Sequence, residues 1–140
     1  MKLHFAEQTF SFELLRAASY GLSGGSEIGE VLATAKQIQK GDFDSWHRAF
    51  HDTASRIEAL AEDSLHRRHC LSAGQAFSRA SNYYRAAEFF LAPDDPRRLA
   101  TFDKSRTSFW KFLEASGLCV ERVRIPYEGT TLPGYLYRVD

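Results

Sequence analysis

The hydrophobic pattern of the sequence changes its period at Gly117, and this change constrains the fold more than any other feature. Before Gly117, apolar residues recur every three to four positions, which is the spacing of one face of an α-helix. After it, Val123, Ile125 and Tyr127 alternate with arginine and proline, which is the spacing of a β-strand. The sequence therefore predicts a mainly α fold, an antiparallel bundle of about five helices that is followed by a C-terminal β-hairpin.

Glycine, proline and capping residues divide the helical part, residues 1–117, into five segments. We expect helices over about residues 5–20, 26–41, 44–65, 73–91 and 95–117. Ser26 and Asp95 are typical N-caps, and Gly21 is typical of a left-handed helix end. The polar run 66–69 is expected to end the third helix and to form the connection to the fourth.

The helical spacing also indicates which side chains face inward. In the first helix we expect the stripe of Phe12, Leu15 and Ser19 to face the core. In the fifth helix we expect Leu99 to lie on the buried face. The predicted core centres on Trp46, Phe50, Ile57, Phe77, Ala80, Tyr84, Phe102 and Phe109.

The hairpin is expected to occupy residues 118–140, with strands at 119–128 and 132–139 and a Glu-Gly-Thr-Thr turn between them. Both strands are rich in Val, Ile, Leu and Tyr, so we expect both faces of the hairpin to be covered and one edge to be paired. A lone two-stranded hairpin is marginally stable in water. The chain ends directly after the second strand, and we therefore expect it to be a fragment of a larger enzyme or one subunit of a split enzyme.

Composition excludes several classes of protein. Eighteen Lys and Arg balance eighteen Asp and Glu over 140 residues, which argues against a nucleic-acid partner. No apolar run is long enough to span a membrane, and the N-terminus has no signal-peptide core. Two cysteines, Cys70 and Cys119, cannot form a disulfide framework. These features predict a reduced, cytoplasmic protein.

Four segments carry a resemblance to a known group of α/β-hydrolases. They are GGSEIGEVLATAKQI at 24–38, GDFDSW at 41–46, SRASNYYRAAEFFL at 78–91 and VRIPYEGTTLPGYLYR at 123–138. From about Phe10 onward the chain resembles the N-terminal helical region and first two sheet strands of that group. The group includes FrsA-like esterases, the dihydroxypseudooxynicotine hydrolase and fungal chain-shortening hydrolases of polyketide pigment pathways.

The resemblance implies a lid over an active site, with a part in dimerisation. Enzymes of this group cleave C–C, ester or amide bonds of small molecules through a serine nucleophile and without a cofactor. Their hydrolase core supplies the nucleophile, the oxyanion hole and the other triad residues. This sequence contains no third strand and no oxyanion loop, so we expect no catalytic residue in it and no activity without a C-terminal hydrolase core. Its partners would be that core, a second copy of the chain, and a small-molecule substrate in the cleft between lid and core.

A different class of function is a self-contained helical protein-interaction module. The hairpin separates the two interpretations, because a hydrolase sheet begins with such a hairpin and an interaction module does not need one.

The segment Gly21–Gly25 matches the nucleophile motif G-x-S-x-G. That motif needs a strand before the serine and a helix after it. Here a helix precedes Ser23, so we expect a turn between two helices.

The histidines could suggest a metal site. His47 and His51 share a helix face, and His66, His69 and Cys70 lie close together in the sequence. Because the usual paired-ligand spacings are absent, we expect solvated surface histidines and no bound metal.

The candidate substrate-binding residues combine aromatic and charged side chains, mainly from the fourth helix. They are Trp46, Arg79, Tyr83, Tyr84 and Glu88. Such side chains could form the wall of a lid, but aromatic stripes on helices are more often core. Glu27 and Glu30 are expected to stabilise the start of the second helix.

Overall fold

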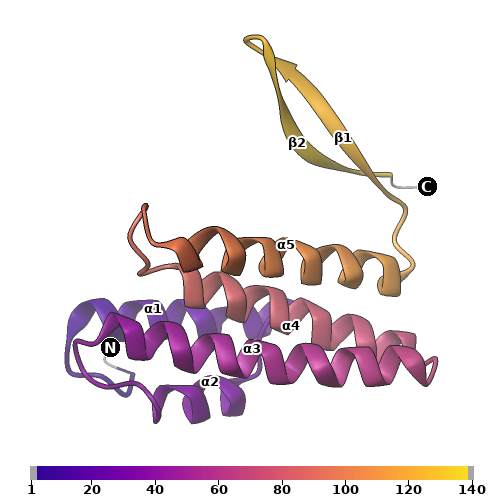
Figure 1. The fold of residues 1–140 in the computed structure, drawn as a ribbon. Coiled ribbons are helices and arrows are strands. Elements are labelled where there is room, and N and C mark those ends of the chain that lie inside the picture. Colours follow the sequence, from indigo (N-terminus) through magenta and orange to yellow (C-terminus); the bar gives the residue numbers. More distant parts are fainter. Residues whose placement is uncertain (1–2, 139–140) are drawn as a thin grey trace.

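The computed structural model describes residues 3–138 and confirms a mainly α fold with a C-terminal hairpin (Figure 1). In chain order the elements are α1 (Gln8–Ser19), the 3-10 turn η1 (Tyr20–Ser23), α2 (Ile28–Ala35), α3 (Phe43–His66), α4 (Cys70–Glu88), α5 (Pro96–Ser116), β1 (Val120–Tyr127) and β2 (Thr130–Tyr137). None of these helices is long and apolar enough to cross a membrane.

The three long helices form the body of the molecule. Helix α4 lies between α3 and α5 and packs extensively on both, and successive helices run in opposite directions. Helices α1 and α2 pack beside the N-terminal half of α3 and the C-terminal half of α4, where Phe10 contacts Trp46 and Thr34 bonds to Thr53 at 2.8 Å. The bundle is therefore thicker at this end.

Carboxylate side chains cap most of the helices. The Glu27 carboxylate accepts the Glu30 backbone N–H at 2.9 Å, so Glu27 caps α2 as expected of an acidic residue at a helix start. Ser26 is not the cap, because its hydroxyl donates to the Ala18 carbonyl at 3.1 Å instead. Asp95 caps α5 as predicted, and Pro96 occupies the first turn.

The helix ends depend on backbone conformation. Helix α1 ends before Gly21, and the left-handed residue is Gly24, whose φ is 74°. The predicted second helix reaches only Ala35 rather than Gly41. Gly117 closes α5 with a φ of 68°, as expected.

The core agrees with the prediction for α3 and α4 and disagrees for α1 and α5. Six of the eight predicted core residues are buried; Phe102 is 40 % exposed and Phe109 is partly exposed. In α5 the buried residues are mainly small, and Ser105 exchanges two hydroxyl-to-carbonyl bonds with Ser81, each 2.9 Å long. Around Ser105 this close approach of α5 to α4 leaves no room for large side chains, and Leu99 also lies outside.

Helix α1 is rotated relative to the prediction. Phe10, Leu14 and Ala17 face the core, whereas Phe12 is 63 % exposed and Leu15 is also exposed. Phe10 packs against Trp46, Phe43 and Phe90, and this aromatic cluster fixes the inward face.

The hairpin turns over two residues rather than four. Glu128 and Gly129 both have positive φ, 42° and 80°, as a tight primed turn requires. Tyr127 therefore pairs with Thr130, and both threonines of the predicted turn belong to β2. Strand β2 ends at Tyr137, and position 139 of the predicted strand lies outside the described residues.

The pairing register decides which side chains share a face, because residues directly opposite one another lie on the same side. One face, which we call the aliphatic face, carries Val123, Ile125, Tyr127, Leu132 and Leu136. The opposite face carries Tyr135 and Tyr137 together with Arg122 and Arg124. Apolar residues therefore lie on both faces as predicted, but on the second face Val120, Tyr135 and Tyr137 are interspersed with arginines.

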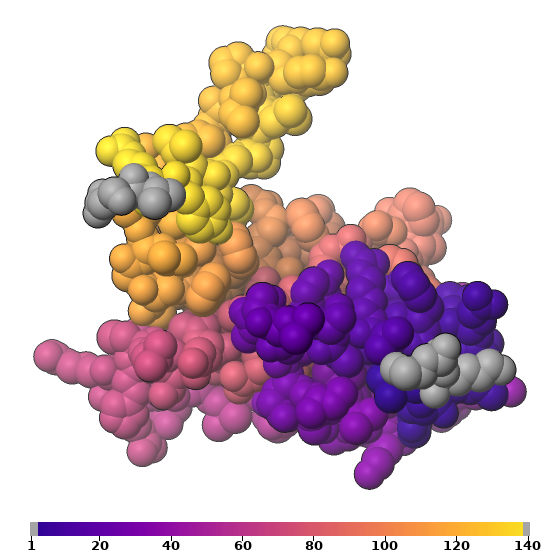
Figure 2. Space-filling model, turned by 180° about the vertical axis from the view of Figure 1, so that it is seen from behind, coloured from indigo at the N-terminus to yellow at the C-terminus, as the bar shows by residue number. Residues whose placement is uncertain are grey.

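The second face contacts α5 at its end nearest the helices. The Tyr135 ring contacts Phe109 and stacks on Trp110, and the Arg122 guanidinium lies 3.7 Å from the centre of the Trp110 ring. The rest of the hairpin projects away from the bundle, as Figure 2 shows from behind. Within residues 3–138 it pairs with no third strand.

Candidate functional site

The five predicted substrate-binding residues lie in four separate environments. Trp46 is in the core, where its indole N–H donates to the Ala86 carbonyl at 2.9 Å and its ring contacts Phe50 and Phe90. With its polar atom satisfied and its ring buried, Trp46 joins α3 to α4.

Arg79 and Tyr83 meet at a carboxylate of α2. The Tyr83 hydroxyl donates to Glu30 at 2.8 Å and accepts the Glu27 backbone N–H at 2.8 Å. The Arg79 Nε donates to the same Glu30 oxygen at 3.0 Å. Burial raises the pKa of Tyr83, so its phenol stays a hydrogen-bond donor. This network fastens α2, a helix of only eight residues, to α4.

Tyr84 lies on the other side of α4. Its hydroxyl donates to Glu58 at 2.7 Å and lies 3.0 Å from the Ser55 hydroxyl. The Lys104 ammonium lies over the Tyr84 ring at 5.1 Å and 3.8 Å from Glu58. Burial raises the pKa of Tyr84 as well. Tyr84 thus connects α3, α4 and α5.

Glu88 is a buried carboxylate, only 4 % exposed, at the end of α4. The Arg98 Nε forms an ion pair with one of its oxygens at 2.9 Å, and Arg85 donates to the other oxygen. Leu99 and Phe102 of α5 lie beside it in a recess that opens to the surface near the α4–α5 connection. A pair of arginines around one carboxylate is a stable arrangement, and the apolar side chains give the recess a surface on which a small molecule could pack.

Ser23 of the G-x-S-x-G match lies in η1, and its hydroxyl donates to the Tyr20 carbonyl at 3.1 Å. Helix α1 precedes it and no strand feeds it, so the expected turn between two helices is confirmed. Ser23 lacks the strained strand-to-helix setting that activates a nucleophile.

The expectation of surface histidines is wrong for His47. Its side chain is buried, with Nδ1 3.2 Å from the Ala87 carbonyl. His51 is half-buried beside it, and burial lowers the pKa of His51. His66 and His69 are exposed. Across residues 3–138, no cluster of His, Cys, Asp and Glu is arranged to hold a metal ion.

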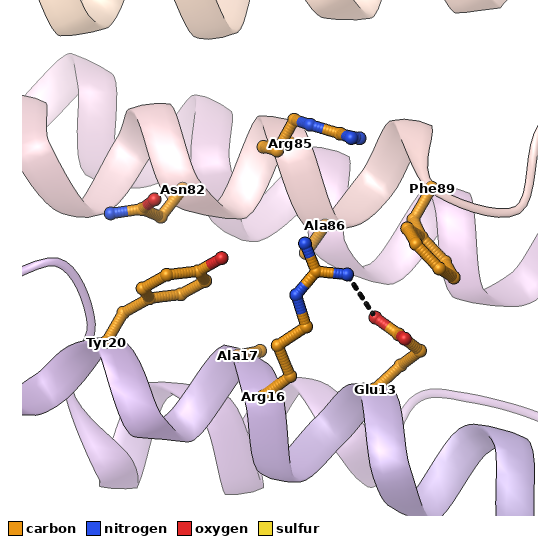
Figure 3. A pocket seen from close by; sticks show the side chains of 8 residues that line it. All are labelled: Glu13, Arg16, Ala17, Tyr20, Asn82, Arg85, Ala86 and Phe89. Atoms are coloured by element: carbon orange, nitrogen blue, oxygen red, sulfur yellow. Dashed lines mark hydrogen bonds and ion pairs between the residues drawn. The ribbon is translucent and has the colours of Figure 1, made fainter.

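The sequence analysis missed a recess between α1 and α4 (Figure 3). Its lining consists of Glu13, Arg16, Ala17, Tyr20, Asn82, Arg85, Ala86 and Phe89. None of the five predicted substrate-binding residues lines it. The i, i+3 pair of Glu13 and Arg16 is the signal that could have indicated this recess. The apolar pattern predicted the wrong inward face for α1, however, so it also gave the wrong orientation for these two side chains.

Among known proteins, the chain is similar in sequence to several fungal proteins named hydrolases. The chain is 42 % identical to hydrolase acrC of Aspergillus aculeatus, over 91 % of this chain and 32 % of that protein. It is 42 % identical to 20-hydroxy-prefusarin hydrolase FUS2 of Gibberella moniliformis, over 95 % of this chain and 32 % of that protein. It is 37 % identical to α/β-hydrolase psoB of Aspergillus fumigatus, over 95 % of this chain and 31 % of that protein.

No family model matches the chain. The chain spans about a third of the length of the curated relatives it matches. Along nearly its whole length, this chain is therefore a homologue of one part of fungal proteins named hydrolases and α/β-hydrolases.

Proposed function

We propose that residues 1–117 are the helical lid and dimerisation portion of a serine α/β-hydrolase, and that residues 118–140 begin its catalytic sheet. The hydrolase would act on a C–C, ester or amide bond of a small molecule in the cytoplasm, without a cofactor, as in the FrsA-like group. The single observation that carries this proposal is the uncovered aliphatic face of the hairpin in a chain homologous to hydrolases.

The aliphatic face needs a cover. Ile125, Leu132 and Leu136 are each about half exposed, at 52 %, 47 % and 48 %. A two-stranded hairpin with such a face gains stability only when further strands or helices bury it. Helix α5 contacts the other face only at Tyr135 and Arg122, and nothing in the described residues contacts the aliphatic face in this way. A hydrolase core that continues the sheet would bury it.

The catalytic residues would come from that core, because Ser23 has no nucleophile geometry. Of the candidate substrate-binding residues, Glu88 lines a recess, where its buried carboxylate would orient Arg85 and Arg98 while the exposed Leu99 and Phe102 contact the substrate. Trp46, Arg79, Tyr83 and Tyr84 would act by fixing the helices of the lid, because their polar atoms bond within the bundle.

The experiment is a chimera with 20-hydroxy-prefusarin hydrolase FUS2, in which this chain replaces the stretch to which it aligns. We expect the chimera to fold and to hydrolyse 20-hydroxy-prefusarin, and the isolated chain to hydrolyse neither that compound nor p-nitrophenyl esters. A matched pair of variants tests the contact between the hairpin and the hydrolase core. Leu132→Glu, on the aliphatic face, should make the chimera insoluble or inactive. Thr131→Glu, on the opposite face, should leave it soluble and active.

Turnover of p-nitrophenyl esters by the isolated chain that Ser23→Ala removes would overturn the proposal. An inactive chimera, together with equal behaviour of the two glutamate variants, would favour the self-contained interaction module.

A further inference from the structure

The recess between α1 and α4 brings two arginines to one small space. Figure 3 shows Arg16 reaching from α1 toward α4, where Arg85 extends along the facing helix. The Tyr20 hydroxyl points into the same space, and Phe89 closes one side. Asn82 forms a fixed wall, because its amide nitrogen donates to the carbonyls of Gly25 and Ser78.

The hydrogen-bonding capacity of these arginines is only partly used. Arg16 contacts Glu13 through one nitrogen at 3.4 Å, which is long for a charge-assisted bond. Its guanidinium also lies 5.3 Å from the centre of the Phe89 ring. Arg85 bonds to Glu88, which lies outside the recess. A guanidinium has five N–H donors, so both arginines keep donors for a further acceptor.

The charges around the recess leave a positive surplus. Arg16 pairs with Glu13, while Arg85 and Arg98 share the single carboxylate of Glu88. Among the residues that line the recess, the cations Arg16 and Arg85 face the single carboxylate of Glu13, a surplus of one positive charge. A monoanion would balance it.

The size of the recess restricts what can enter. The recess has a volume of about 20 Å³, which is room for about one water molecule, so one oxygen of a carboxylate could enter it while the rest of the group lies at its mouth. A carboxylate is planar, carries one charge and matches the fork of a guanidinium. A larger body attached to it would lie outside, against the exposed part of the Phe89 ring.

We propose that the recess lined by Arg16, Arg85 and Phe89 binds the carboxylate group of a small organic acid, with the arginines as anion donors. An acid with an aromatic body binds more tightly than acetate, because its ring also covers Phe89. The site does not depend on the proposed hydrolase activity, since it uses residues of this chain alone.

The test is an NMR titration of the full chain with sodium benzoate, at constant ionic strength kept with sodium chloride. We expect saturable shifts of the backbone amides of Ala17, Asn82 and Ala86. Benzamide, which has the same ring and no charge, should give no saturable shift. Acetate should bind with a higher Kd than benzoate.

Three variants complete the test. Arg16→Gln and Arg85→Gln should each raise the Kd for benzoate by about tenfold, the loss of one charge-assisted contact. The control is Arg48→Gln, which removes the same charge from an exposed arginine of α3 outside the recess and should leave the Kd unchanged. Circular dichroism would show that each variant folds.

Three results would overturn the proposal: shifts that do not saturate, equal binding of benzamide, or equal weakening by Arg48→Gln. Binding of inorganic phosphate that is tighter than that of benzoate would also contradict it, since the recess would then select charge rather than a carboxylate.

Discussion

The sequence predicts that Phe77 and Phe102 both lie in the core, but in the structure they differ in burial. Phe77 is fully buried in α4, while Phe102 on α5 is 40 % exposed. We expect Phe77→Ala to lower the free energy of unfolding by about 3–5 kcal/mol, because it removes a buried ring and leaves a cavity. Urea unfolding followed by circular dichroism measures the change.

The matched control is Phe102→Ala, which we expect to cost less than about 1 kcal/mol. A cost below ~1 kcal/mol for Phe77→Ala, or equal costs for the two variants, would show that the buried face of α4 is misplaced.

His51 makes the stability depend on pH. Burial is the main cause that lowers its pKa, and the neighbouring His47 and Lys104 lower it further, against Asp52 and Glu58. In the unfolded chain the pKa returns to about 6.5, so the unfolded state binds the proton more readily. The stabilising effect of neutral His51 is therefore complete above that pKa and is lost as the pH falls below it.

We expect the free energy of unfolding to decrease between about pH 7.5 and pH 5, and His51→Gln to reduce this slope. His66→Gln, at an exposed histidine, is the control and should leave the slope unchanged. An unaltered slope in His51→Gln would mean that His51 titrates alike in both states.

At the scale of elements, the sequence predicted the helices and the hairpin better than the faces of the helices. The prediction for α4 is correct, because this helix lies between α3 and α5 and most of its apolar residues are buried whichever way they point. In α1 and α5 large apolar residues lie on two faces, and spacing alone cannot tell which face turns inward. Small residues decide the matter in α5, since Ser81 and Ser105 bond directly across the interface.

Candidate site residues show the same limit. The sequence identified Tyr83, Tyr84 and Glu88 as polar or aromatic residues of one helix, but most of their partners come from other helices. Tyr83 bonds to Glu30, 53 positions away, and Glu88 to Arg98 across the α4–α5 connection. Such pairs depend on tertiary packing, which a local pattern does not contain.

At the scale of the whole molecule, the hairpin should control self-association. Its aliphatic face and its unpaired edges can pair with a second copy, although Pro133 and Gly134 weaken the edge of β2. We expect the full chain to associate as its concentration rises, and a variant that lacks residues 119–140 to lose the part of this association that depends on the hairpin. Light scattering at several concentrations measures this.

Ile125→Glu should suppress the association, and Thr131→Glu, on the opposite face, should not. The full chain could be monomeric at every concentration, with the same oligomeric state as the deletion variant. The hairpin would then be stable by itself, which would contradict the proposal that another protein surface buries its aliphatic face.

The attachment of the hairpin has a mechanical consequence. A single short segment, residues 117–119, joins the helices to the strands, and the stacking of Tyr135 and Arg122 on Trp110 holds the two parts at their angle. A hairpin fixed at one end behaves as a lever, so a small rotation at residues 117–119 displaces the distant turn at Gly129 by many times more. The contacts of Trp110 with Tyr135 and Arg122 restrain that rotation, so loss of the Trp110 ring would widen the range of angles between the hairpin and the helices.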